Sequence, residues 1–254
     1  MSRNILELGW DTLSTELLDN RRCQALIPQL NDFENTVFGP DFACGCAQIQ
    51  PWIDSGCLLY SAVSGEAVAG QRRILSVTSV FITTSLARDR MLLGEIPDYE
   101  LTPWAAAPRS AQPAIYFSSV VSAAPHHLAA MYASLLECVR DFREANGLVF
   151  HGGFAIAAGS GGHRHMAKSG FRLLNGYKYR GIYDLMVIDA HTAASAFWCG
   201  LLSDETIFLR RADGASERIA SDLPPAGHST MEDDARKVEK RLARAKADRL
   251  RLDY

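Results

Sequence analysis

The sequence lacks any apolar run that could cross a lipid bilayer. A spanning helix needs about 20 consecutive apolar residues, whereas the longest apolar segments, such as 148–158, are strand-sized and contain His or Gly. Near the start, Glu7 and polar residues interrupt the apolar stretch that a secretory signal requires. We therefore expect a cytoplasmic protein without a membrane partner.

A strong charge of one sign is also missing. The formal net charge is -3, which excludes a general polyanion-binding surface. The charged segment 229–254 mixes acidic and basic residues closely, and this mixture argues against nucleic acid as a partner.

The six cysteines do not form a paired set of metal ligands. Cys44 and Cys46 flank one glycine, and Cys57 follows, but structural zinc sites usually contain two pairs with ligands two to four residues apart. We expect no metal and reduced thiols. Hydrolase and nucleotide-binding motifs are missing as well. No Gly-x-Ser-x-Gly elbow occurs, and the segment 159–162 lacks the Lys-Ser or Lys-Thr of a phosphate loop, so it is expected to be a flexible turn.

Hydrophobic periodicity predicts an α/β (α+β) chain. Helices are expected over 11–38 with a break at Pro28, and over 49–55, 128–145 and 163–169. Strands are expected over 57–63, 68–70, 74–84, 114–121, 148–158 and 182–188, with a hairpin turn at 64–66. Residues 87–104 have no clear period.

The organisation expected is one domain and a tail. Residues 1–222 would form the domain, with a core of about 11–190, and residues 223–254 a linker followed by a charged helix or flexible tail. The Pro-Pro-Ala-Gly stretch after Leu223 marks the boundary.

The segment 114–189 carries the most information about function. It reads strand, helix, strand, short helix, strand, and the short helix ends in Ala167-Lys168-Ser169-Gly170-Phe171. This order and this ending resemble the GNAT superfamily of acyl-CoA N-acyltransferases. The resemblance implies a GNAT-like mixed, mostly antiparallel central sheet with flanking helices, in which the parallel strands 114–121 and 148–158 splay apart.

The resemblance also implies a donor site for acetyl-CoA or another acyl-CoA. A backbone N–H near Val120, Val121 or Ser122 would bind the thioester oxygen. The pyrophosphate would lie at the start of the following helix, at His126, His127, Leu128, Ala129 and Ala130. The chain departs from the family pattern here, because Ala130 and Tyr132 stand where the phosphate loop has glycine or a small residue.

Proton-transfer residues are less sharply defined. Where the family places a tyrosine as general acid this chain has Met166. His163 or His165 is therefore expected to protonate the leaving thiolate, or one of Tyr177, Tyr179 and Tyr183 in the following segment. Glu100, in an acidic loop with Glu95 and Asp98, is expected to be the base for the amine. Strand alternation predicts that only one of two adjacent serines, Ser118 or Ser119, lines the cleft.

The sequence therefore favours an N-acyltransferase acting on a small-molecule or peptide amine. Two alternatives stay open: a catalytically inactive GNAT-like binding or regulatory module, and an acyltransferase whose donor is an acyl carrier protein docked near Arg140 and Arg143. Whether the chain forms a homodimer is also open.

Overall fold

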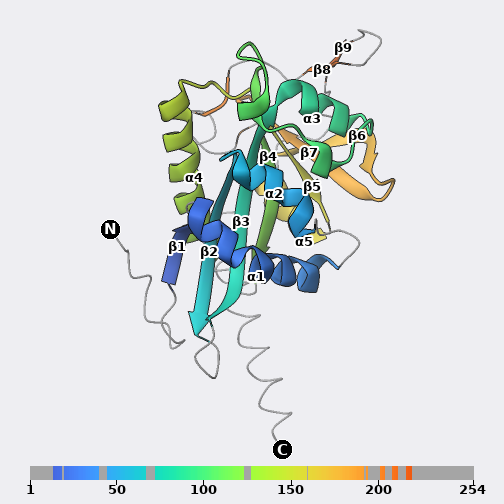
Figure 1. Ribbon diagram of the computed structural model, residues 1–254. Helices are drawn as coiled ribbons and strands as arrows, with labels where there is room; N and C mark the ends of the chain where they lie inside the picture. Colours follow the sequence, from blue (N-terminus) through green and yellow to red (C-terminus); the bar gives the residue numbers. More distant parts are fainter. Residues whose placement is uncertain are drawn as a thin grey trace, which may run out of the picture. The chain divides into compact units, whose positions relative to one another are not determined.

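Seven strands of the computed structural model form one mixed sheet (Figure 1). The model describes residues 14–18, 20–39, 45–66, 72–122, 127–158, 160–191, 193, 201–203, 208–210 and 216–218. The strands lie in the order β1 (Ser14–Leu18), β2 (Leu58–Glu66), β3 (Arg72–Thr84), β4 (Pro113–Ser122), β5 (Gly153–Ala157), β7 (Tyr183–Ile188) and β6 (Arg172–Tyr179). All neighbouring pairs are antiparallel except β4 and β5, which are parallel. The expected mixed, mostly antiparallel sheet is confirmed.

Five α-helices accompany the sheet: α1 (Asn20–Phe38), α2 (Cys46–Asp54), α3 (Ser85–Leu92), α4 (His127–Asn146) and α5 (Ser160–Lys168). Two short 3-10 helices, η1 (Asp98–Glu100) and η2 (Trp104–Ala106), follow α3, and a separate two-stranded sheet pairs β8 (Phe208–Arg210) with β9 (Ser216–Arg218). These counts refer to the described ranges. None of the helices there is long and apolar enough to cross a membrane.

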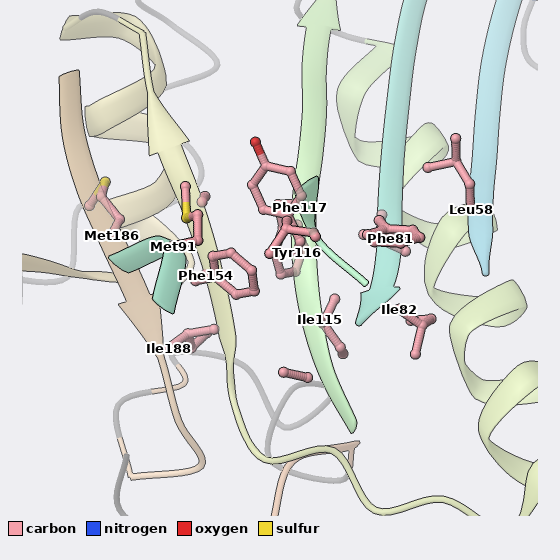
Figure 2. Close-up of a cluster of buried hydrophobic side chains, with 14 of the residues drawn as sticks. Leu58, Phe81, Ile82, Met91, Ile115, Tyr116, Phe117, Phe154, Met186 and Ile188 are labelled. Atoms are coloured by element: carbon pink, nitrogen blue, oxygen red, sulfur yellow. The ribbon is translucent and has the colours of Figure 1, made fainter. Parts of the chain in front are cut away.

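Aromatic side chains form the core between the sheet and α2. The Trp52 ring stacks on Phe81 of β3 with 4.2 Å between centroids, and meets Tyr116 of β4 edge-on. Tyr116 in turn stacks on Phe154 of β5 at 4.9 Å. Figure 2 shows this core running from Leu58 across the strands to Phe154. We call the face that carries Phe81 and Tyr116 the front face; α1 and α2 cross in front of it in Figure 1.

Residues 85–112 form an insertion between the adjacent strands β3 and β4. Thr84 caps α3 by accepting a hydrogen bond from the Ala87 N–H at 3.1 Å. Arg88 and Asp89 of α3 are buried and joined by an ion pair of 2.7 Å, and Arg88 also donates to the His151 carbonyl just before β5. The pair therefore attaches the insertion to the crossover between β4 and β5.

Several sequence predictions need correction. Ser14–Leu18 was expected to be helical but pairs with β2, because the free edge of that strand offers a hydrogen-bonding ladder that outweighs a short apolar pattern. Residues 64–66 continue β2 instead of turning, and α1 runs through Pro28. The strand expected over 148–158 is ordered as a strand only over Gly153–Ala157.

Two further elements were not predicted as they are. The helix α3 lies in the segment without a clear period, since its buried face contains the charged pair. The helix α5 begins at Ser160, so Gly161 and Gly162 belong to its first turn and not to a flexible turn. The predicted tail 223–254 and strand 68–70 lie outside the described residues.

Loss of one partner of the buried pair should destabilise the fold. We expect Asp89→Asn to lower the free energy of unfolding by about 3 kcal/mol, because Arg88 would keep its charge in a buried site. Urea denaturation measures this change. The matched control is Glu95→Gln in the exposed Arg90–Glu95 pair, which should change stability by less than about 0.5 kcal/mol. Equal effects of the two substitutions would contradict the account.

Candidate active site

The parallel strands β4 and β5 are paired over three residues only. Their ladder joins Ile115 to Gly153, Tyr116 to Phe154 and Phe117 to Ala155, and then ends. Both strands continue, β4 to Ser122 and β5 to Ala157. The two strands are thus paired at one end and splayed at the other, as predicted.

A β-bulge in β4 begins where the pairing ends. Val80 of β3 pairs with Phe117 and Ser79 pairs with Ser119, so Ser118 is an extra residue. Directly opposed residues of an antiparallel pair share a face, which puts Ser119 on the face of Ser79. The Ser118 hydroxyl lies 2.7 Å from the Ser79 hydroxyl and is therefore on that face too. The bulge interrupts the strand alternation on which the prediction for the two serines rested, yet only Ser118 of the two lines the cavity on this face.

The bulge also decides which amides face the splay. The Ile115 N–H donates to the Gly152 carbonyl at 3.1 Å, so odd-numbered amides of β4 point toward β5 as far as Phe117. The extra residue shifts this alternation by one. The amides of Val120 and Ser122 consequently point to the β5 side, beyond the last residue pair of the β4–β5 ladder.

Helix α5 lies on the back face of the sheet. The Phe117 side chain points away from the front face, and its ring meets Phe171 edge-on with 5.0 Å between centroids. Phe171 follows α5 directly, after Gly170, whose φ of 96° is the left-handed conformation that ends the helix. The Gly-Phe ending identified in the sequence thus fixes α5 behind the splay.

Helices α4 and α5 touch through one aromatic pair. The Tyr132 hydroxyl of α4 lies 2.9 Å from Nε2 of His165 on α5, and the two rings stack with 5.1 Å between centroids. Burial lowers the pKa of His165, assisted by the nearby charge of Lys168. Burial also raises the pKa of Tyr132 above its usual range. At neutral pH the pair is therefore a neutral imidazole and a protonated phenol.

The front face contains a small cavity next to the bulge, which we call the front pocket. Its volume is about 40 Å³, room for a few water-sized groups. Helices, strands and insertion all contribute to its lining: Glu34, Phe38, Ile49, Trp52, Leu58, Tyr60, Ser79, Asp98, Tyr116 and Ser118. The pocket therefore joins α1, α2, the insertion and the bulged strand.

Glu34 is one of the two carboxyl groups that line this pocket. Burial raises its pKa from the ordinary 4.5 to about 7, and the nearby Ser119 hydroxyl acts in the opposite direction. Ser119 is 5% exposed, and its hydroxyl makes no hydrogen bond of ordinary geometry within the described part of the chain. A carboxyl with a pKa near 7 is suited to accept and release a proton at neutral pH.

Asp98 closes the other side of the front pocket. Its carboxylate accepts hydrogen bonds from the Tyr179 hydroxyl at 2.6 Å, the Tyr116 hydroxyl at 3.2 Å and the Tyr99 N–H at 3.0 Å. Its negative charge raises the pKa of Tyr179, an effect second to burial. The insertion thus places an acidic group beside the aromatic core.

These features decide the fold class. The chain has a GNAT-like fold. The splayed parallel pair, the helices at its back and the Gly-Phe ending of α5 are the features that the sequence resemblance implied.

Comparisons with known proteins add little to this conclusion. No family model and no curated protein matches the chain. Among solved structures, it is similar to Arabidopsis thaliana NAA60 in complex with a bisubstrate analogue, with 12% identity over 70% of this chain and 97% of that chain, and a TM-score of 0.45. NAA60 in complex with acetyl-CoA is 12% identical over 70% of this chain and 98% of that chain, with a TM-score of 0.44. AtaTR bound with AcCoA is 13% identical over 73% of this chain and 95% of that chain, with a TM-score of 0.38. At these identities and TM-scores we draw nothing about chemistry from them.

The predicted donor-site residues of the GNAT-like fold fall into two groups. Val120, Val121 and Ser122 lie on the splayed part of β4. His126 lies outside the described residues. His127, Leu128, Ala129 and Ala130 form the first turn of α4, and the structure describes their backbone but not their side chains.

The predicted proton-transfer residues are dispersed. His165 pairs with Tyr132, and His163 lies on the same helix. Tyr183 begins β7 and pairs with Tyr179 in the ladder. Glu100 is exposed in η1 and does not line the front pocket, whereas its neighbour Asp98 does.

Glu34 was not among the candidates from sequence. It lies in α1 within Asn31-Asp32-Phe33-Glu34-Asn35, a polar stretch typical of a solvated helix face. Only the packing of α1 on the sheet shows that this one carboxyl is partly buried, near Ser119, while Asp32 is exposed. No local pattern could have distinguished the two.

Glu34 should make stability depend on pH. Because its pKa is raised in the folded state, its contribution to stability is present below pH 4.5 and is lost as pH rises through about 7. We expect Glu34→Gln to be more stable than wild type by about 2–3 kcal/mol at pH 9 and nearly equal to it at pH 4.5. Urea denaturation at the two pH values measures this, with Asp32→Asn as the exposed control. A pH-independent difference would contradict the assignment.

Proposed function

We propose that this chain is an N-acyltransferase that moves an acetyl or other acyl group from acyl-CoA to an amine. The observation that carries the proposal is the position of Glu34 near Ser119 at the bulge, in a strand whose following residues lie outside the β4–β5 ladder. An amine acceptor needs a base and a thioester carbonyl needs a hydrogen-bond donor. In the proposed mechanism Glu34 supplies the base and the β4 backbone supplies the donor.

The donor would enter from the back and the acceptor from the front. The splay separates the α4–α5 side, where Tyr132 and His165 meet, from the front pocket. The pantetheine arm would lie between β4 and β5 beyond the end of their ladder, where their backbone groups are not paired with each other. The N-terminus of α4 at His127 would hold the pyrophosphate through its backbone N–H groups.

Different residues of the chain would act as the oxyanion donor, the base and the acid of this reaction. The Val120 N–H would donate a hydrogen bond to the thioester oxygen and stabilise the charge that develops there. Glu34 would accept the proton that the amine loses as its nitrogen bonds to the acyl carbon. The carbon–sulfur bond breaks, and the Tyr132–His165 pair would supply a proton to the departing thiolate. The products are an amide and a free thiol.

A non-catalytic binding module is the second candidate, and Tyr132 favours it. Its ring stacks on His165 at a position where the family has a small residue, and so takes up space between α4 and α5. An acyl carrier protein donor is a third, with Arg140 half-exposed and Arg143 partly buried on α4. Thermal-shift titrations with acetyl-CoA, a long-chain acyl-CoA and an acylated carrier protein separate the three. Only a ligand that binds the folded state raises the melting temperature, and this rise increases with ligand concentration.

The base is the most direct target for mutagenesis. We expect kcat/KM for acetyl transfer to rise with pH through an apparent pKa of about 7, and Glu34→Gln to lower it roughly 100-fold and to remove this dependence. Thiol release from acetyl-CoA in the presence of amine measures the rate. Glu100→Gln is the control and should leave the pH profile unchanged. A normal profile in Glu34→Gln would assign the base elsewhere.

The hydroxyl of Tyr132 can be removed without removing its ring. We expect Tyr132→Phe to lower kcat about 100-fold, because the proton path to the thiolate is interrupted, while the KM of the amine stays unchanged. Steady-state kinetics with acetyl-CoA and amine give both parameters. An unchanged kcat together with a changed affinity for acetyl-CoA would make the pair a packing contact that shapes the donor site.

A further inference from the structure

We infer that the front pocket selects an aliphatic ammonium group without a neighbouring carboxylate, so the acceptor is a cationic alkyl amine or lysine-type side chain and not an α-amino acid. This inference rests on the proposed function, because it names the acceptor class of that same site. It is argued from the lining of the pocket, its size and one buried hydroxyl.

The lining is acidic and aromatic. Glu34 and Asp98 are its charged members, and among the described residues no Lys, Arg or His belongs to the lining. Phe38, Trp52, Tyr60 and Tyr116 supply four aromatic rings. Ring faces and carboxylates both attract cations, whereas a carboxylate entering this pocket would meet like charge and no basic partner.

The aromatic rings are held in place and do not need to rearrange around a ligand. Trp52 is fixed by its stack on Phe81 and by its edge contact with Tyr116. The Tyr116 hydroxyl donates to Asp98, which also accepts from Tyr179. A cation that enters this pocket loses little by ordering the side chains around it.

A second observation points independently to a ligand. Ser119 is 5% exposed, faces the front with Ser118, and lies close to the Glu34 carboxyl. Its hydroxyl makes no hydrogen bond of ordinary geometry among the described residues, and the Glu34 carboxyl is the polar group near it. Buried hydroxyls are normally satisfied, and an ammonium group between Ser119 and Glu34 would hydrogen-bond to both.

The size of the cavity limits the group that enters. A volume of about 40 Å³ accommodates an ammonium nitrogen and one or two methylene groups. A branched carbon bearing a carboxylate next to the amine would exceed this space as well as bringing the wrong charge. Size and charge therefore exclude the same class of acceptor.

The test compares two acceptors that differ only by the carboxylate: pentylamine and norleucine, each with acetyl-CoA. We expect kcat/KM to be at least 10-fold higher for pentylamine. Asp98→Asn should reduce this ratio several-fold, and Asp141→Asn, an exposed carboxylate on α4, should leave it unchanged. Equal rates with the two acceptors, or a preference for norleucine, would overturn the inference while the proposed function stands.

A binding measurement keeps the inference testable without catalysis. Thermal-shift titration with pentylamine alone should raise the melting temperature, and norleucine alone should not. If acetyl-CoA neither binds nor reacts, the proposed function fails, and the amine titration still decides whether the pocket takes an ammonium group. If Asp98→Asn does not fold, Ser119→Ala is the second variant and should weaken the shift caused by pentylamine. No shift with pentylamine would overturn the inference.

Discussion

The parting of β4 from β5 is the constraint on which the rest of the site depends. Two parallel strands in a sheet normally satisfy each other's backbone groups along their common length. Here the ladder stops at Phe117 and Ala155, and the extra residue Ser118 redirects the chain at that point. One irregularity therefore produces both features that the proposed chemistry needs: amides that face the splay, and two serines on the front face, of which Ser118 lines the front pocket.

Packing contacts on both faces of the sheet surround the bulge in β4. On the back face, Phe117 meets Phe171 at the end of α5, and Tyr132 joins α4 to α5 through His165. On the front face, Trp52 packs on Phe81 and Tyr116. The insertion is attached by the buried Arg88–Asp89 pair and brings Asp98 to the front pocket. A desolvated, partly buried carboxyl such as Glu34 lowers the stability of the fold as pH rises above neutral, which is the kind of cost that functional sites carry.

The parts of the fold that could be predicted are those specified by local sequence. The apolar run of β4, the periodicity of α4 and the Gly170-Phe171 ending of α5 were all identified, because each depends on neighbours along the chain. The bulge could not be predicted, since two adjacent serines fit ordinary alternation equally well. For a similar reason Glu34 was not identified from the sequence, and Asp98 was only one of several acids in its loop. Their burial depends on helix docking and on the insertion, which no spacing pattern reports.

The most direct measurement is an amide NMR titration of the ¹⁵N-labelled protein with acetyl-CoA. The account predicts saturable chemical-shift changes at the amides of Val120 and Ser122, which face the splay, and at the first amides of α4. It predicts little change at Ser119, whose amide faces β3. Saturable binding that leaves Val120 and Ser122 unperturbed, or no binding at all, would contradict the claim that the splay between β4 and β5 is the donor site.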